Sequence, residues 1–193
     1  MINIGATGII QEVLESFTSG VKNIAVGNIE DREREILLAQ GYIIEDNATM
    51  GSFICKDETA LDILKDSRIY KEYFSKEEAQ KPVWFIKDLG LILGYPPEAV
   101  KVFDDINTDW SSPIMVNYCG LIFRSFENTL AEDIHWLFKN KPVEEKHFSL
   151  MISFEAEYTN LVSDLYKYSL LRVKYGTSLE KIDEMLEEIL LTK

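Results

Sequence analysis

The chain has 193 residues, of which 46% are hydrophobic and 27% are charged, close to the average of globular proteins. This composition excludes a disordered or fibrous chain, and a chain of this length buries enough apolar surface to fold without a metal or a disulfide. The 33 Asp and Glu residues outnumber the 20 Lys and Arg residues, so the net charge is −13. We therefore expect no binding to nucleic acid or to an anionic membrane through a basic surface, because contacts with phosphates need clustered cations.

Targeting signals are not evident in the sequence. No window reaches the run of about 20 apolar residues that a membrane span needs, and residues 1–5 lack the pattern of a secretory signal. Cys55 and Cys119 are each flanked by apolar, strand-like residues, which is typical of buried, reduced thiols, although the spacing leaves a disulfide between them open. We expect a cytoplasmic protein, and the style of the sequence is that of a bacterial or phage protein.

The N-terminal part of the chain predicts a βαββα order, which indicates a small sheet covered by helices. Strands are expected at residues 23–27, 42–45 and 51–56. Between the first two strands the pattern predicts a helix over residues 29–40, with Asn28 as its N-cap and Gly41 as its end. Asp57 begins the next helix, which extends toward Tyr73.

The middle of the chain is predicted to be helical up to residue 103, with a break at Pro82 and a turn at residues 94–97. Residues 114–126 are rich in β-forming side chains, and a helix is expected to begin at residue 128 or 129.

The last quarter predicts two helices joined by a short turn at Gly176. Apolar side chains recur three and four positions apart on the first helix, at Met151, Phe154, Tyr158, Leu161, Leu165 and Tyr168. The second helix is capped by Thr177, and its apolar seam consists of Leu179, Ile182, Leu186 and Ile189. So short a turn predicts an antiparallel hairpin in which the two apolar faces pack together.

The expected fold class is therefore α+β. A small mixed β-sheet, with helices packed on it, forms a core over residues 1–143, and the helical hairpin occupies residues 144–193 and packs on that core as one unit.

Residues 5–8, Gly-Ala-Thr-Gly, look like the opening of a dinucleotide-binding βαβ unit, with Glu30 and Asp31 near the position of a ribose-binding acid. Gln11 occupies the third glycine position, however, and its long side chain prevents the close helix packing that the motif requires. A turn before a helix is the favoured interpretation, and no cofactor is expected.

Residues 105–111 place oxygen-bearing side chains at alternate positions, as the first half of a calcium loop does. Trp110 replaces the glycine of that loop, and Val116 stands where the bidentate Glu belongs. Turns in which Asp and Asn bond their own backbone are the favoured interpretation, and no calcium site is predicted.

Both histidines follow a glutamate by three residues, Glu132 before His135 and Glu144 before His147. This is the ligand pattern of di-iron carboxylate bundles, but Pro142 lies between the two pairs, so they cannot come from long facing helices. No metal site and no complete catalytic set is predicted, while a Cys119–His135 couple stays open because catalytic pairs meet in space.

The segment Leu-Gly-Tyr-Pro-Pro-Glu-Ala-Val at 93–100, with the later Tyr118-Cys119-Gly120-Leu121, is similar to an uncharacterised family of bacterial proteins built on an LGYP-x-x-x-V segment and a Cys-Gly strand. The resemblance covers about residues 83–138. It implies a compact α+β core and no function.

The leading hypothesis for function is an acidic, non-enzymatic interaction protein, an intracellular inhibitor or regulator that docks on another protein. Strongly one-signed charge steers association with a basic partner, and exposed aromatic side chains are enriched at interfaces. The alternative is a small-molecule-binding protein or enzyme with a pocket between the sheet and the middle helices. A homo-oligomer held through the C-terminal helices is a third hypothesis. The candidate binding residues are Trp84, Tyr95, Trp110, Tyr158, Tyr166 and Tyr168.

Overall fold

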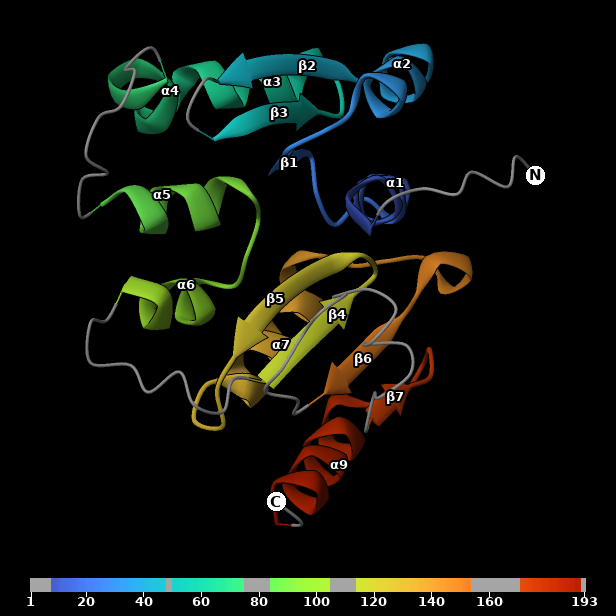
Figure 1. Cartoon of the computed structure of the whole chain (residues 1–193). Coiled ribbons are helices and arrows are strands. Elements are labelled where there is room, and N and C mark those ends of the chain that lie inside the picture. The colour runs from blue at the N-terminus through green and yellow to red at the C-terminus, as the bar shows by residue number, and fades with distance from the viewer. Residues whose placement is uncertain (1–7, 48–49, 75–83, 105–113, 154–170, 192–193) are drawn as a thin grey trace.

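The computed structural model describes residues 8–47, 50–74, 84–104, 114–153 and 171–191. Within these residues the strands form two antiparallel sheets with helices packed against them, so the α+β class is confirmed (Figure 1). Since every pairing is antiparallel and there are two sheets, the prediction of one small mixed sheet is corrected in its detail.

The first sheet has the order β1-β3-β2. Its strands are β1 (Ile24–Gly27), β2 (Ile43–Asn47) and β3 (Gly51–Cys55), at the positions that the sequence predicts. Side chains alternate between the two faces of each strand, so Phe53 and Cys55 join one apolar cluster and Ile54 joins another. Both faces of this sheet are therefore covered.

Helices from two parts of the chain cover these faces. One cluster is completed by α3 (Glu58–Asp66), α4 (Arg68–Tyr73) and α5 (Phe85–Ile92). The other is completed by α1 (Gly8–Ser19) and α2 (Asp31–Ala39).

Capping side chains fix where these helices begin. Asp57 accepts a hydrogen bond from the Ala60 N–H, which confirms it as the N-cap of α3. Ser67 ends α3 and caps α4, so the single helix expected toward Tyr73 is two helices. The prediction of Asn28 as the cap of α2 was wrong, because Glu30 occupies that position in a reciprocal capping box with Glu33.

The second sheet has the order β5-β4-β6-β7. Its strands are β4 (Ile114–Tyr118), β5 (Leu121–Ser125), β6 (Leu150–Ser153) and β7 (Leu171–Val173). A large apolar cluster joins this sheet to α7 (Leu130–Asn140), which lies behind it in Figure 1, and to α9 (Leu179–Leu191). A short 3-10 turn, η1 (Glu145–His147), leads into β6.

The C-terminal quarter agrees with the sequence analysis only in part. The final helix is present as α9, and its seam residues Ile182 and Leu186 are buried. The prediction of Thr177 as its cap was wrong, because Ser178 directly precedes the helix and its hydroxyl accepts the Lys181 N–H at 3.2 Å. They pack toward α7 and β7 in the second core. Residues 150–153 and 171–173 are strands, so the two ends of the expected first helix of the hairpin were wrong. The intervening residues 154–170 lie outside the described part of the chain.

Helix α6 (Pro97–Asp104) follows the turn at Gly94 and contacts α5 on one side and α7 and β5 of the second sheet on the other. The first backbone N–H groups of a helix have no partner within the helix, and Pro97 has no N–H at all. The N–H of Ala99 finds its partner outside the helix, because Asp133 of α7 accepts a hydrogen bond from it at 3.0 Å. Ser125 donates to the other oxygen of the same carboxylate at 2.6 Å. The fully buried Asp133 therefore ties α6, α7 and β5 together.

Several predicted features fall on residues that are not described. They are residues 5–7 of the glycine motif, the break at Pro82, the calcium-like run 105–111, and the candidate binding residues Trp110, Tyr158, Tyr166 and Tyr168. None of the helices that are described has the length and apolar character to cross a membrane.

Candidate functional site

An apolar cleft of about 300 Å³ lies between α5 and α6. Its lining consists of Ile86, Leu89, Gly90, Leu93, Tyr95 and Val100. Two large apolar side chains of α5, Ile86 and Leu91, are 40% and 46% exposed. Ile86 is therefore an apolar side chain of the lining that is partly exposed, whereas Leu91 is exposed on α5 outside that lining.

The close approach of the two helices depends on Gly90. A Cβ atom at this position would lie 2.7 Å from a methyl group of Val100, which is closer than non-bonded carbons can pack. The glycine in the middle of α5 thus has a packing reason, and it sets how near the two walls of the cleft come.

Of the two candidate binding residues that are described, only Tyr95 lines this cleft. Its ring carries the Lys22 amine at 5.3 Å from the ring centroid, which is a cation–π contact. Trp84 lies elsewhere: the guanidinium of Arg68 stacks on its ring at 3.9 Å. Trp84 is therefore not among the described residues that line this cleft.

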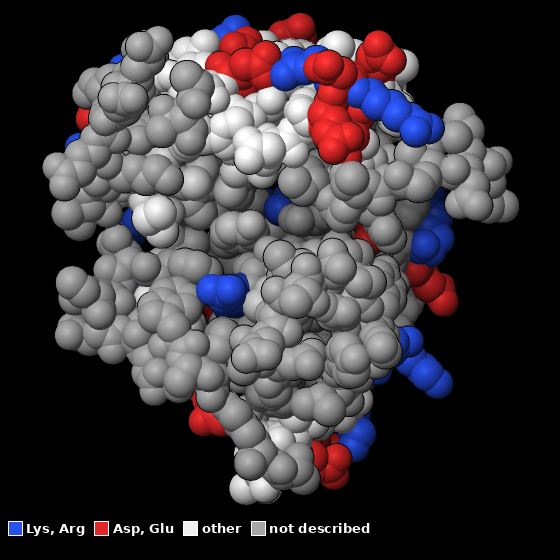
Figure 2. Space-filling model, in the orientation of Figure 1, with Lys and Arg blue, Asp and Glu red and all other residues white. Residues whose placement is uncertain are grey.

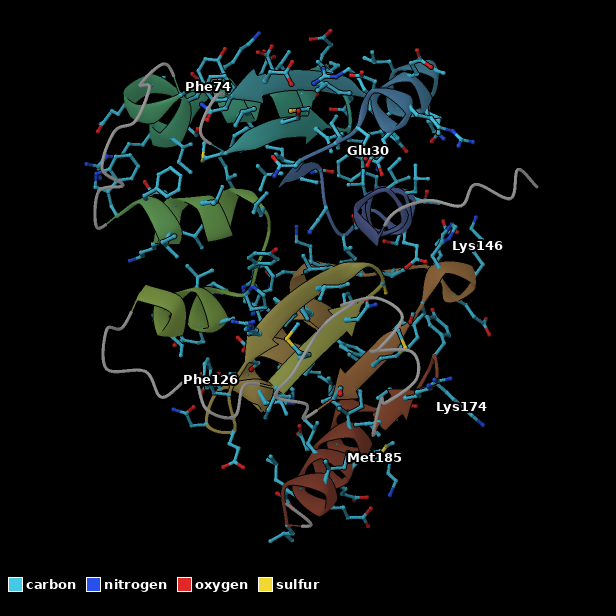
Figure 3. All side chains as sticks on the ribbon, in the orientation of Figure 1. Glu30, Phe74, Phe126, Lys146, Lys174 and Met185 are labelled. Carbon is cyan, nitrogen blue, oxygen red and sulfur yellow. The ribbon has the colours of Figure 1, made fainter. Side chains whose placement is uncertain are left out.

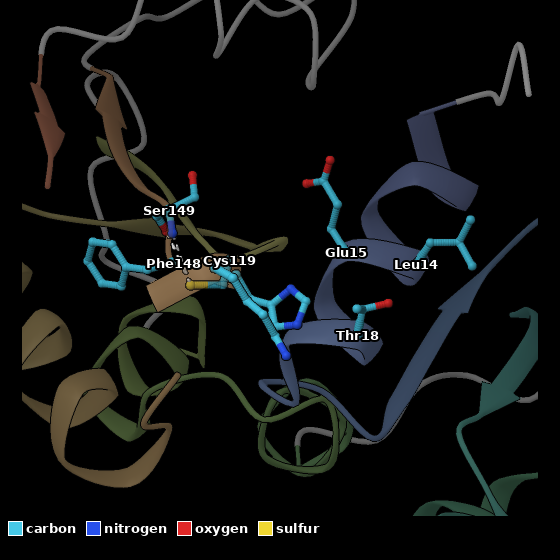
Figure 4. Close-up of a pocket in the computed structure, with 8 residues that line it drawn as sticks. Leu14, Glu15, Thr18, Cys119, Phe148 and Ser149 are labelled. Carbon is cyan, nitrogen blue, oxygen red and sulfur yellow. Dashed lines mark hydrogen bonds between the residues drawn. The ribbon is translucent and has the colours of Figure 1, made fainter. Parts of the chain in front are cut away.

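A second, more polar cleft of about 420 Å³ lies between α1 and η1 (Figure 4). Figure 4 shows Leu14, Glu15 and Thr18 along one wall and Cys119, Phe148 and Ser149 along the other. Two residues of η1, Lys146 and His147, complete the lining. Figure 3 places Lys146 on η1 beside α1.

Cys119 belongs to the tight turn that joins β4 to β5. Tyr118 pairs with Leu121, so Cys119 and Gly120 are the two loop residues, and both have positive φ (53° and 87°). Positive φ at both positions is the mark of a type I′ turn, which favours Asn-Gly. A cysteine at the first position is uncommon, and the surrounding contacts must hold it there.

Those contacts use every polar group of Cys119. Its N–H donates to the Ser149 carbonyl at 2.8 Å, and the Ser19 hydroxyl donates to its carbonyl at 2.9 Å. Its thiol donates to the Ser149 carbonyl at 3.3 Å and accepts from the Ser149 N–H at 3.4 Å. The cysteine thereby fastens the turn to the chain just before β6.

The same environment keeps the thiol protonated. The pKa of Cys119 is raised to about 11, mainly by burial and to a smaller extent by the charge of Glu15, while the backbone hydrogen bond with Ser149 partly offsets these effects. Since the thiolate is the nucleophile, a thiol with this pKa is inert near neutral pH. Cys119 is a structural residue in the floor of the cleft.

The two histidines have different surroundings. His135 on α7 lies against Asp183 on α9, with Nε2 at 2.9 and 3.1 Å from the two carboxylate oxygens. The hypothesis of a catalytic pair of Cys119 and His135 is therefore not supported. His147 is the histidine that lines the same cleft as Cys119. Among the described side chains, no group of three His, Cys, Asp or Glu residues is arranged to hold a metal ion.

A third cleft, also about 300 Å³, is lined by aromatic side chains next to the second sheet. Phe148 packs edge-on against Tyr118 and Tyr175, and Phe138 lies within 6 Å of both Tyr118 and Phe148. Phe148 comes from the segment before β6, and Tyr175 comes from the segment after β7.

Figure 2 shows the charged side chains of the described residues on one face of the molecule. Acidic side chains gather along its upper edge, over α2 and β2, with basic residues among them. One such contact is the ion pair between Arg34 and Asp46.

Comparisons with protein-family models, curated proteins and solved structures give no match to this chain. No family model supports the resemblance noted for residues 83–138 either. Function is therefore inferred from the clefts themselves.

Proposed function

We propose that this chain is an acidic interaction protein that docks on another protein by receiving an apolar side chain of the partner in the cleft between α5 and α6. The observation that carries the proposal is the lining of that cleft, to which the described residues contribute aliphatic side chains, one glycine and one tyrosine. Interfaces draw most of their affinity from a few apolar or aromatic anchors that fill such pockets.

The size of the cleft supports an anchor side chain over a larger ligand. Its volume of about 300 Å³ lies at the lower end of the range of small-molecule pockets, about 300 to 1,000 Å³. Ile86, which is 40% exposed, offers apolar surface within the lining that a side chain of the partner would bury.

Charge gives the second part of the proposal. A net charge of −13 attracts a basic partner and raises the rate of encounter, and this effect weakens as salt is added. The expected partner therefore presents an apolar side chain flanked by Lys or Arg, and the protein would act as its inhibitor or regulator.

Three buried or half-buried side chains with potential for chemistry are used in structural contacts. Cys119 holds a turn, His135 joins α7 to α9, and Asp133 caps α6. Their engagement favours an interaction protein over an enzyme.

The test compares two substitutions of the same kind at similarly exposed isoleucines. The full chain and its Ile86→Glu and Ile63→Glu variants serve as baits in lysate of the source cells, and bound proteins are quantified by mass spectrometry. Ile63 is 49% exposed on α3, away from the cleft, whereas Ile86 lines it. We expect a stoichiometric, basic partner that the wild type and Ile63→Glu retain and that Ile86→Glu loses.

Retention by all three baits would place the interface elsewhere. The alternative function, binding of a small apolar molecule at Tyr95, predicts a retained ligand in native mass spectrometry of the wild type instead of a protein partner.

A further inference from the structure

The cleft between α1 and η1 has walls of opposite charge. Glu15 supplies a carboxylate from α1, and Lys146 and His147 supply an amine and an imidazole from η1. Glu15 lies close enough to the cleft floor for its charge to contribute to the raised pKa of the Cys119 thiol. This arrangement opposes a purely anionic ligand, which Glu15 would repel, and a purely cationic one, which Lys146 would repel.

Polar groups with remaining hydrogen-bonding capacity line the same cleft. In the described part of the chain, the hydroxyls of Thr18 and Ser149 and the ring nitrogens of His147 have no hydrogen-bond partner. Glu15 already has a contact within the chain, but a carboxylate offers about four acceptor sites. Lys146 pairs with Glu144 at 2.8 Å, and this exposed pair contributes little and can be exchanged for a ligand.

Apolar side chains complete the lining. Leu14 and Phe148 stand on opposite walls in Figure 4, with the buried Cys119 between them. A ligand that fills the cleft therefore needs a charge of each sign and an apolar part.

We propose that this cleft binds a small zwitterion, a free α-amino acid with an apolar side chain. Its ammonium group would bind Glu15, and its carboxylate would bind Lys146, His147 and the Ser149 hydroxyl. Its side chain would lie between Leu14 and Phe148. The site is separate from the docking cleft at α5 and α6, so either proposal can fail without the other.

Three probes of equal shape and different charge test the proposal. L-leucine carries both charges, L-leucinamide lacks the carboxylate, and 4-methylpentanoate lacks the ammonium group. Titration of each into the full chain, followed by calorimetry or by protein-observed NMR, gives their affinities. We expect saturable binding of L-leucine, and binding of each one-charge analogue that is at least about tenfold weaker, equivalent to about 1.4 kcal/mol.

Two variants assign the charges to the walls. Glu15→Gln should weaken L-leucine binding by at least about tenfold, and Lys146→Gln should narrow the preference for L-leucine over L-leucinamide. Glu187→Gln, at an exposed position on α9, is the matched control and should leave binding unchanged. All variants are compared by thermal unfolding, so that loss of binding is not mistaken for loss of fold.

Absence of saturable L-leucine binding to the folded wild type would overturn the proposal. So would equal affinity for 4-methylpentanoate, because the cleft would then recognise an anion or an apolar group without Glu15. Unchanged L-leucine binding by Glu15→Gln would exclude the proposed ammonium site.

Discussion

Asp133 is a buried carboxyl group held between three elements, and its replacement by Asn isolates the energetic effect of its charge. Asn keeps the shape of the side chain and an oxygen that can accept the Ala99 N–H bond at the start of α6. Its amide N–H can donate to Ser125, which reverses the direction of the present hydrogen bond. The substitution therefore removes the ionisable group while retaining most of the contacts.

The size of the effect follows from the pKa. Burial raises the pKa of Asp133 from 3.8 to about 6, and the hydrogen bonds from Ser125, the Ala99 N–H and Thr129 only partly offset it. A shift of about two units corresponds to about 3 kcal/mol. Because the folded state holds the proton more tightly than the unfolded state, this contribution to stability is fully present below about pH 4 and is lost as the pH rises through about 6.

Urea denaturation of the wild type and Asp133→Asn, at intervals from about pH 4 to about pH 7, measures this contribution as a difference between the two proteins. We expect the free energy of unfolding of the wild type to fall relative to the variant by up to about 3 kcal/mol across the interval. A constant difference, or a shift in favour of the wild type at high pH, would mean that the hydrogen bonds and the helix terminus outweigh burial.

Other substitutions test the packing and the thiol. Leu186→Ala should lower the free energy of unfolding by about 2–5 kcal/mol because the side chain is buried in the second core. The control, Glu187→Ala at an exposed position, should change it by less than about 0.5 kcal/mol, and equal effects of the two substitutions would contradict this packing. Gly90→Ala should destabilise by about 1 kcal/mol despite its better helix propensity, because the new methyl group meets Val100, and a smaller cost in a Val100→Ala background would identify that contact as the cause. Since the pKa of Cys119 rises from 9.0 to about 11, its thiolate fraction near pH 7 is about a hundredfold lower, so an aqueous disulfide reagent should modify Cys119 rapidly only after unfolding.

The N-terminal half of the fold could be predicted because its signals are local. Asp57 caps the helix that directly follows it, and Gly41, with a φ of 85°, ends α2 at the expected place. The pairing of strands is not local in this sense. Residues 114–118 read as another strand of the same sheet, but they join residues 150–153, and that choice depends on packing between distant segments.

The error at Met151 has a specific physical cause. β6 lies between β4 and β7, and all four of its residues are buried, so the alternation that marks a half-buried strand is missing. A short, fully apolar run cannot be distinguished from a buried helix segment by periodicity. The apolar residues that follow at helical spacing then extend the helix assignment back into the strand.

That error also concealed the partner of Cys119. The Cys119 N–H donates to the Ser149 carbonyl, so the hairpin turn lies beside the start of β6, and His147 is two residues before Ser149. If residues 150–153 formed a helix, they could not pair with β4, and Ser149 would not lie beside the Cys119 turn. The sequence analysis therefore considered His135, and not His147, as the partner of Cys119. With the strand in place, the thiol is occupied by the Ser149 backbone and the imidazole stays available in the same cleft. The cysteine therefore contributes to the geometry of this cleft, and in the site that we propose the charged side chains on its walls would recognise the ligand.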